Sequence, residues 1–308
     1  MFKDYIAIAR INHWFKSIFI LPGIGFAILV TGEPYKEHLI FSIIIGILSV
    51  CLISSANYSI NEWLDLEHDR HHPLKKNRPS VLGKITYNGV VAQYFILATI
   101  GLLLSSYISK PFFVTSVFFL IMGIIYNVDP LRTKDVPYLD VLSESINNPI
   151  RLMLGWFIIS NTMIPPSSLI VSYWMGGAFL MTVKRYAELR LIDNRSTATL
   201  YRKSFRHYTE NNLLVSSLFY AMTFAFFFGI FMIKYRIELL LILPFFSLLF
   251  AWYLNIGMSK NSSAQRPEEL YKETMFTLYV VLLVVFFCIL LFVQIPSLQW
   301  FLKVSLFT

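Results

Sequence analysis

The sequence predicts an all-α integral membrane bundle of about nine transmembrane helices around a central polar cavity open to the cytoplasm. Of the 308 residues, 56% are hydrophobic and only 14% are charged, whereas soluble domains usually carry about 25% charged residues. Apolar stretches near the length of roughly 20 residues that a spanning helix needs recur along the chain. Polar residues enter some of these stretches, so we expect lipid outside the bundle and a polar cavity inside it.

Each helix is predicted from one apolar stretch, with turn and breaker residues such as Asp129-Pro130 and Pro165-Pro166 between many of them. The expected helices cover about 17–32, 38–62, 86–108, 111–128, 138–161, 166–185, 212–233, 237–257 and 273–294. We expect one domain over residues 1–308, with cytoplasmic loops at about 63–85, 129–137, 186–211 and 258–272. The start of the chain is amphipathic and basic, so no cleavable signal peptide is expected.

The placement of basic residues predicts the orientation. If the N-terminus is cytoplasmic, most of the 26 lysines and arginines lie in the N-terminal segment and the four loops above. The opposite side then carries Lys36, Lys110, Lys234, Arg236 and Lys303. We therefore expect a multi-pass protein of the cell inner (plasma) membrane with a cytoplasmic N-terminus. Topology accounts for the net charge of +8, and no nucleic acid is expected as a partner.

An acidic motif follows the second predicted helix. Asn61, Asp65 and Asp69 are four residues apart, which keeps them on one helical face. Carboxylate and amide oxygens suit Mg²⁺, which takes few protein ligands and is completed by substrate phosphates. A solvated helix end is the structural alternative, but ionisable groups at a membrane helix end favour a functional site. We predict Asp65, Asp69 and Asn61 as Mg²⁺ ligands beside a diphosphate, with both aspartates catalytic.

Basic residues follow the acidic motif directly. Arg70, Lys75 and Arg78 are expected to bind phosphate oxygens from the side opposite the metal. A third polar cluster, at the end of the sixth predicted helix, contains Lys184, Arg185, Tyr186 and Glu188. Its alternative explanation is a basic anchor that only sets topology.

A second polar cluster lies between the fourth and fifth predicted helices. It contains Tyr126, Lys134, Asp135, Asp140 and Arg151, with Glu144, Asn147 and Asn148 between the last two. Because these residues continue into an apolar helix, a buried binding cavity is favoured over a polar seam between helices. The sequence leaves open whether Asp135 or Asp129 accompanies Asp140.

Taken together, these motifs resemble the UbiA superfamily of intramembrane transferases, over nearly the whole chain. The resemblance implies nine transmembrane helices and two Asp-rich motifs, one after helix two and one after helix four. Three runs are similar to the polyprenyl-phosphate (decaprenyl-phosphate) phosphoribosyltransferase branch: Arg10-x₃-Trp14-x-Lys16, Asp69-Arg70-x-His72-Pro73, and 184–189. Residues 143–149 depart from that branch, which leaves the acceptor open.

The resemblance implies Mg²⁺-dependent transfer of a phosphoribosyl group from phosphoribosyl diphosphate to a polyprenyl phosphate, with release of diphosphate. Asp65, Asp69, Asp135 and Asp140 are the expected catalytic residues. The expected substrate-binding residues are Asn61, Lys16, Arg70, Lys75, Arg78, Tyr126, Lys134, Arg151, Lys184, Arg185, Tyr186 and Glu188. The alternative is a prenyltransferase that moves an isoprenyl group from its diphosphate to an aromatic or other small acceptor. A transporter without chemistry is the third hypothesis. Membrane lipids are expected partners, and homo-oligomerisation stays open.

Overall fold

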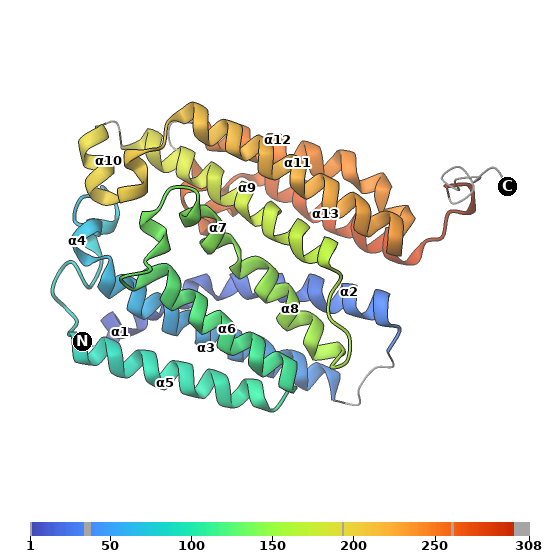
Figure 1. Cartoon of the computed structure of the whole chain (residues 1–308), viewed down its shortest axis with the longest axis horizontal. Coiled ribbons are helices and arrows are strands. Elements are labelled where there is room, and N and C mark those ends of the chain that lie inside the picture. The colour runs from blue at the N-terminus through green and yellow to red at the C-terminus, as the bar shows by residue number, and fades with distance from the viewer. Residues whose placement is uncertain (1, 34–37, 193, 260–261, 299–308) are drawn as a thin grey trace.

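A computed structural model describes residues 2–33, 38–192, 194–259 and 262–298, and the regular elements in these residues are helices. The long helices lie roughly along one axis, with α3, α5 and α6 on one side and α11, α12 and α13 on the other (Figure 1). Helices α8 and α9 lie between the two groups. The predicted all-α bundle is confirmed. Lys36, Lys260 and Lys303 lie outside the described residues.

The first half of the chain begins with three short elements, and the backbone bends between the first two of them. Arg10 adopts a left-handed conformation with φ of 51°, which ends the first helix and turns the chain into a 3₁₀ segment. The elements of this half are α1 (Phe2–Ala9), the 3₁₀ segment Ile11–Ile20, α2 (Leu21–Thr31), α3 (Leu39–Leu64), α4 (Leu66–Asp69), α5 (Tyr87–Ser106) and α6 (Lys110–Asn127).

The second half begins with two short helices and continues with long ones. Its helices are α7 (Leu139–Ser145), α8 (Asn147–Ile159), α9 (Ser167–Leu191), α10 (Arg195–Tyr201), α11 (Glu210–Tyr235), α12 (Leu243–Gly257) and α13 (Thr274–Phe292). A 3₁₀ segment, Ile237–Ile242, precedes α12 and extends its span.

Within the described residues, seven helical segments are long and apolar enough to cross a membrane, against the nine expected. The predicted helix 138–161 is two helices, because Pro149 has no N–H for the carbonyl of Ser145 and its ring clashes there. The predicted helix 166–185 is α9, which is long enough but less apolar because it carries serines, glycines and a charged last turn. Both regions are helical, so the architecture holds.

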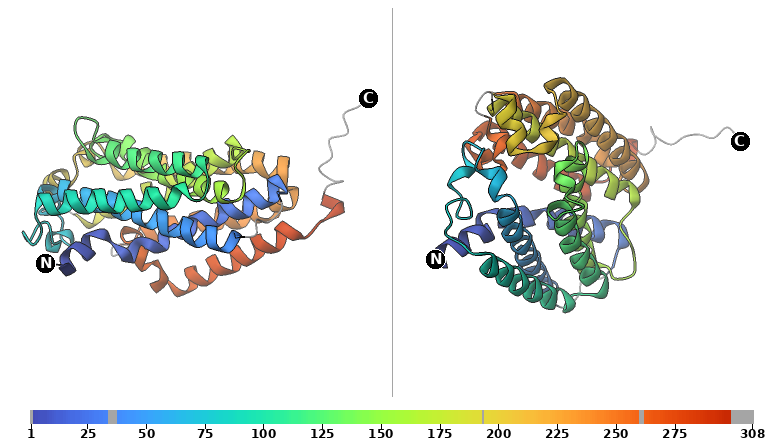
Figure 2. Two further views of the ribbon diagram at one scale, coloured as in Figure 1. Left: turned by 90° about the horizontal axis from the view of Figure 1, so that it is seen from below. Right: turned by 60° about the vertical axis from the view of Figure 1, so that its left-hand side comes forward.

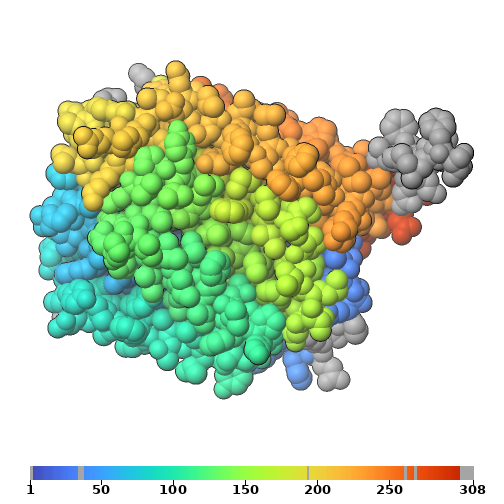
Figure 3. All heavy atoms as spheres, in the orientation of Figure 1, coloured from blue at the N-terminus to red at the C-terminus, as the bar shows by residue number. Residues whose placement is uncertain are grey.

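The predicted loop 186–211 is wrong at its start, since α9 continues to Leu191 through strong helix formers. The rest of that loop forms α10, which packs against the segment after α4. The rings of His72 and Tyr201 lie 4.5 Å apart, and Lys75 donates a hydrogen bond to the Tyr201 hydroxyl. Figures 2 and 3 show α4 and α10 side by side at the end of the bundle that also carries α1.

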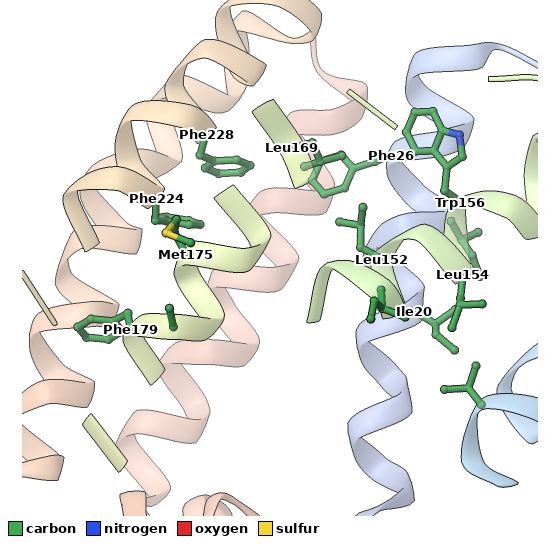
Figure 4. Close-up of a cluster of buried hydrophobic side chains, with 14 of the residues drawn as sticks. Ile20, Phe26, Leu152, Leu154, Trp156, Leu169, Met175, Phe179, Phe224 and Phe228 are labelled. Atoms are coloured by element: carbon green, nitrogen blue, oxygen red, sulfur yellow. The ribbon is translucent and has the colours of Figure 1, made fainter. Parts of the chain in front are cut away.

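The apolar core has two main packing zones (Figure 4). In one, Met175 and Phe179 of α9 face Phe224 and Phe228 of α11. In the other, α2 packs closely against α8. A Cβ on Gly155 would lie 2.0 Å from the carbonyl oxygen of Ile20, so only glycine permits this approach. Small residues at membrane helix contacts let backbones pack this tightly, and here they fix α8 beside the cavity described next.

Candidate functional site

A cavity of about 750 Å³ lies between the N-terminal 3₁₀ segment and helices α3, α6, α7, α8 and α9. It gathers side chains from the three polar clusters and the N-terminal segment. The expected site residues on its wall are Lys16, Asn61, Asp65, Lys75, Arg78, Tyr126, Arg151, Lys184, Arg185 and Glu188. Segments far apart in the chain therefore meet here.

The acidic motif reaches two neighbouring cavities. The predicted helix 38–62 extends to Leu64, the backbone at Asp65 takes φ −94° and ψ 0°, and α4 follows directly. Asn61 and Asp65 line the large cavity, whereas Asp69 is 1% exposed and lines a smaller cavity that it shares with Asp65. Asp69 is ion-paired there with Arg78. The three side chains thus remain at one end of α3, with Asp69 behind the main wall.

Lys134 joins two members of the acidic motif. Its Nζ lies 2.5 Å from Oδ1 of Asp65 and donates to Oδ1 of Asn61 at 3.1 Å and of Asn127 at 2.8 Å. Burial acts to raise the pKa of Asp65, but the charges of Lys134 and Arg132 outweigh it and hold this pKa below its usual range. Burial lowers the pKa of Lys134 to about 8, against the opposing effect of Asp65. Asp65 is therefore ionised near neutral pH.

Asp135 belongs to the smaller cavity, not to the large one. Its Oδ2 accepts from Nε of Arg132 at 3.0 Å and lies 3.0 Å from Nζ of Lys203. Arg132 also donates to Asp65 at 3.1 Å. Asp135 consequently acts on the acidic motif through Arg132, and it lies off the main cavity wall.

The basic side chains of the large cavity are held by buried carboxylates. Lys75 lies 3.7 Å from Glu188, and Arg78 contacts both Asp69 and Glu62. Burial lowers the pKa of Lys75 to about 8, with Glu188 opposing the shift. Arg185 donates to Glu188 at 2.8 Å. These contacts direct cationic groups into the same space as Asn61 and Asp65.

The expectation for Asp140 needs correction. Asp140 is fully buried and is not among the residues that line either cavity. It accepts hydrogen bonds from Arg185 Nε at 2.9 Å, the Tyr208 hydroxyl at 2.5 Å and Ser204 at 3.2 Å, and Arg202 lies at 3.8 Å. The carboxylate is thereby occupied as an anchor for Arg185 and Arg202, which do line the cavity.

Three expected substrate-binding residues also lie away from the wall of the large cavity, and one of them, Lys134, lines only the smaller cavity. Arg70 is exposed and pairs with Glu67 at 3.0 Å on the surface of α4. Tyr186 is buried on another face of α9, in a cluster with residues of α10 and α11, and its hydroxyl donates to Glu210 at 3.0 Å. When polar residues occur on every face of a helix end, the sequence alone does not show which of them line the cavity.

The inner end of the large cavity is polar. Glu144, Asn147 and Asn148, from the segment that departs from the phosphoribosyltransferase branch, line it together with Arg151 and Asn57. Arg151 is 6% exposed, and its guanidinium carbon lies 5.0 Å from the centre of the Phe119 ring. A cation, a carboxylate and several amides therefore form this wall.

A profile described as the UbiA prenyltransferase family matches residues 18–279. The chain belongs to the UbiA prenyltransferase family. It is 26% identical over 212 residues to decaprenyl-phosphate phosphoribosyltransferase of Mycolicibacterium smegmatis, covering 68% of this chain and 63% of that protein. It is 23% identical over 193 residues to protoheme IX farnesyltransferase of Alkalihalophilus pseudofirmus, covering 61% of each. The chain thus spans less than two thirds of these curated relatives.

The fold is that of solved UbiA proteins. A UbiA homolog from Archaeoglobus fulgidus bound to GPP and Mg²⁺ superposes with a TM-score of 0.69 at 19% identity, over 94% of this chain and all of that one. The protein is accordingly a multi-pass integral membrane transferase of the UbiA family.

The donor set of this UbiA protein fits a magnesium ion. Asn61, Asp65 and Asp69 offer only oxygen atoms, the ligands that Mg²⁺ prefers. In the described part of the chain, no three His, Cys, Asp or Glu side chains converge as a metal-binding group. A site with so few protein ligands suits an ion that keeps waters and is completed by phosphate oxygens.

Sequence reasoning missed several charged residues of the UbiA cavity, including Glu62 and Arg202. Glu62, 2% exposed, pairs with Arg10 at 3.1 Å and lies 3.9 Å from Arg78, so it positions two cations. Arg202 lines both cavities. Glu62 is adjacent in sequence to Asn61 and so lies off the helical face that Asn61, Asp65 and Asp69 share, and Arg202 lies in a basic loop. Arg202 differs from the arginines that only set the membrane orientation because its loop folds back over the cavity.

Proposed function

We propose that this UbiA protein transfers a phosphoribosyl group from phosphoribosyl diphosphate to a polyprenyl phosphate and releases diphosphate, with Mg²⁺ as cofactor and one transferase domain over residues 1–308. The observation that carries the proposal is the polar inner wall of the cavity. Asn147, Asn148 and Arg151 suit a sugar phosphate, whereas an isoprenyl chain would leave these groups without polar partners.

The outer part of the cavity is proposed to bind the diphosphate. Lys16, Lys75, Arg78 and Lys184 lie on its wall and offer cationic donors to phosphate oxygens. Asn61, Asp65 and Asp69 would hold Mg²⁺. The ion, when bound, neutralises negative charge on the diphosphate and makes it a better leaving group.

The reaction needs no covalent enzyme intermediate. A phosphate oxygen of the lipid attacks C1 of ribose, the bond between C1 and the diphosphate oxygen breaks, and diphosphate leaves. Lys75, Arg78 and Arg185 stabilise the charge that develops on the leaving group, because they are already oriented by Glu188, Asp69 and Asp140. The cavity supplies the remaining rate enhancement by holding both substrates in line.

Apolar residues offer a path for the lipid tail. Phe15 and Phe19 of the 3₁₀ segment, with Leu180 of α9, line the cavity and are also substantially exposed. An apolar margin that reaches both the cavity and the outer surface suits an acceptor whose phosphate is inside the protein and whose tail lies in lipid.

Basic loops support the orientation. The loops after α3 and α9 lie at the same end of the bundle as α1 (Figure 1). Both loops are rich in basic residues, which include Arg70, Lys75, Lys76, Arg78, Lys84, Arg202, Lys203 and Arg206. By the positive-inside rule this end faces the cytoplasm, which is where a soluble sugar diphosphate would enter. Labelling of a single cysteine introduced at Lys76 in intact cells tests this orientation, since reaction with an impermeant reagent contradicts it.

The function is tested with detergent-purified protein supplied with phosphoribosyl diphosphate, decaprenyl phosphate and Mg²⁺. We expect diphosphate release and a phosphoribosylated lipid, with at least about a hundredfold loss in the Asp65→Asn variant. A protein that turns over isoprenyl diphosphates but not phosphoribosyl diphosphate would overturn the proposal.

Prenyl transfer is the second candidate, because protoheme IX farnesyltransferase is matched at comparable identity and the solved homolog holds GPP and Mg²⁺. Under that function the apolar margin at Phe15, Phe19 and Leu180 receives the donor chain. The same assay with farnesyl diphosphate and an aromatic acceptor distinguishes the two. If no diphosphate donor reacts, transport without chemistry replaces both.

A further inference from the structure

Arg151 is a buried cation near the start of α8. It is 6% exposed and lies on the wall of the cavity. Its Nη1 donates to the carbonyl oxygen of Asn147 at 3.3 Å, but in the described residues nothing accepts a hydrogen bond from its Nε. No carboxylate of the described chain is ion-paired with it. Such a charge is costly unless it serves a ligand.

The surroundings of Arg151 hold it in place without neutralising it. Its guanidinium lies over the Phe119 ring, and the backbone carbonyl of Phe119 accepts from Asn57 Nδ2 at 3.1 Å. One turn earlier on α3, the buried Oγ of Ser54 also lacks a hydrogen-bond partner within the described residues. Asn148, three residues before Arg151 on α8, lines the same cavity. Two polar atoms without a hydrogen-bond partner in the described residues, Ser54 Oγ and Asn57 Oδ1, thus belong to residues that line the same cavity as Arg151.

This cluster is separate from the metal-diphosphate end. Asn57 precedes Asp65 by eight residues on α3, which corresponds to about 12 Å along the helix axis. The acidic motif and Arg151 therefore lie at two levels of one cavity. At the outer level, Lys75 is paired with Glu188, and Arg78 with Asp69 and Glu62, whereas no carboxylate of the described residues is ion-paired with Arg151.

We propose that Arg151, with Ser54 and Asn148, forms a second anion subsite that binds a phosphate monoester remote from the diphosphate. The inference rests on the proposed function and deepens it. Two substrates carry this group: the 5-phosphate of phosphoribosyl diphosphate, and the terminal phosphate of the polyprenyl acceptor. Both would bring a doubly charged phosphate to a fixed guanidinium, which is a strong, charge-assisted interaction.

The first test measures binding and needs no turnover. Thermal melting of the detergent-purified protein is followed with increasing inorganic phosphate, for the wild type and for Arg151→Gln and Arg151→Lys. Arg195→Gln removes an exposed guanidinium outside the cavity and serves as the matched control. We expect at least about tenfold weaker phosphate binding in Arg151→Gln, partial recovery in Arg151→Lys, and no change in the control. Equal binding by Arg151→Gln and the wild type would overturn the subsite.

The second test identifies which phosphate binds. In the wild type and in Arg151→Gln, kcat/KM is compared for phosphoribosyl diphosphate and for ribose 1-diphosphate, which lacks the 5-phosphate. If the subsite holds the donor, the wild type prefers the phosphorylated donor and the variant loses that preference. If it holds the acceptor, the preference is unchanged and KM for decaprenyl phosphate rises. A variant with unchanged KM values for both substrates contradicts the subsite.

The two proposals fail in distinguishable ways. Loss of phosphate binding in Arg151→Gln, with no turnover of phosphoribosyl diphosphate by the wild type, would overturn the proposed function and leave an anion subsite. Normal turnover by the wild type and by Arg151→Gln alike would support the function and overturn the subsite.

Discussion

Lys134 and Asp65 form a buried ion pair, with 2.5 Å between Nζ and Oδ1, at the site proposed for Mg²⁺. The ammonium group also binds Asn61, so it contacts two of the three proposed metal ligands. A lysine in this position balances the carboxylate charge without a divalent ion. Mg²⁺ and Lys134 would therefore compete for the same oxygen atoms.

The first prediction concerns Lys134→Met. Removing one partner of a buried ion pair usually costs about 3 kcal/mol or more, since the remaining charge is uncompensated. We expect the variant to melt lower than the wild type without Mg²⁺ and to gain more in Tm when Mg²⁺ is added. Lys203→Met is the control, because Lys203 pairs with Asp135 at the surface. If Mg²⁺ raises the two Tm values equally, Lys134 does not compete with the ion.

The second prediction separates an anchor from a metal ligand. Because Asp140 is enclosed by Arg185, Ser204 and Tyr208, Asp140→Asn should lower stability by about 3 kcal/mol and reduce kcat. Its half-saturating Mg²⁺ concentration should equal that of the wild type. The separate variant Tyr208→Phe, which keeps the carboxylate charge of Asp140, should retain most of the wild-type activity. A large rise in the Mg²⁺ requirement of Asp140→Asn would return this residue to the metal site.

The helices were predictable because the membrane imposes a length on each apolar stretch. The break near Ile146 was also readable in principle, since Pro149 removes one helical hydrogen bond. The functional site was predictable only in part. Asn61 and Asp65 line the cavity as expected, but nothing in the local sequence shows that Asp140 is enclosed by Arg185 and Tyr208. Such enclosure depends on a loop 60 or more residues further along the chain.

The third prediction concerns pH. Burial lowers the pKa of Lys75 to about 8, so its ammonium loses its proton as the pH rises through 8, while the donor phosphates stay ionised because their second pKa is about 6. We expect KM for phosphoribosyl diphosphate to rise above pH 8 in the wild type. Lys75→Arg should flatten this rise, since arginine stays charged. A rise that persists in Lys75→Arg would assign the titration to another group.

The stability of the folded protein should increase over the same pH range in which binding of phosphoribosyl diphosphate weakens. The pKa of Lys75 is lower in the folded protein than its ordinary value of 10.5, so burial of the charged form opposes folding below about pH 8. This cost diminishes as the pH rises between about 8 and 10.5. Melting of wild type and Lys75→Met across that window is the measurement, and the difference between them should narrow with pH.

The last prediction concerns the α2–α8 contact that positions Arg151. A Cβ on Gly155 would lie 2.0 Å from the Ile20 carbonyl oxygen, and one on Gly23 would lie equally close to the Leu152 carbonyl oxygen. Gly155→Ala should therefore separate the two helices, at a cost of about 1–3 kcal/mol, and shift α8 together with Arg151.

Gly25→Ala is the matched control on α2, because a Cβ there meets no described atom within 4 Å. We expect a lower Tm and weaker phosphate binding in Gly155→Ala and wild-type values in Gly25→Ala. Equal Tm values for the two variants would contradict the tight contact, because both add one methyl group and differ only in the backbone that it meets.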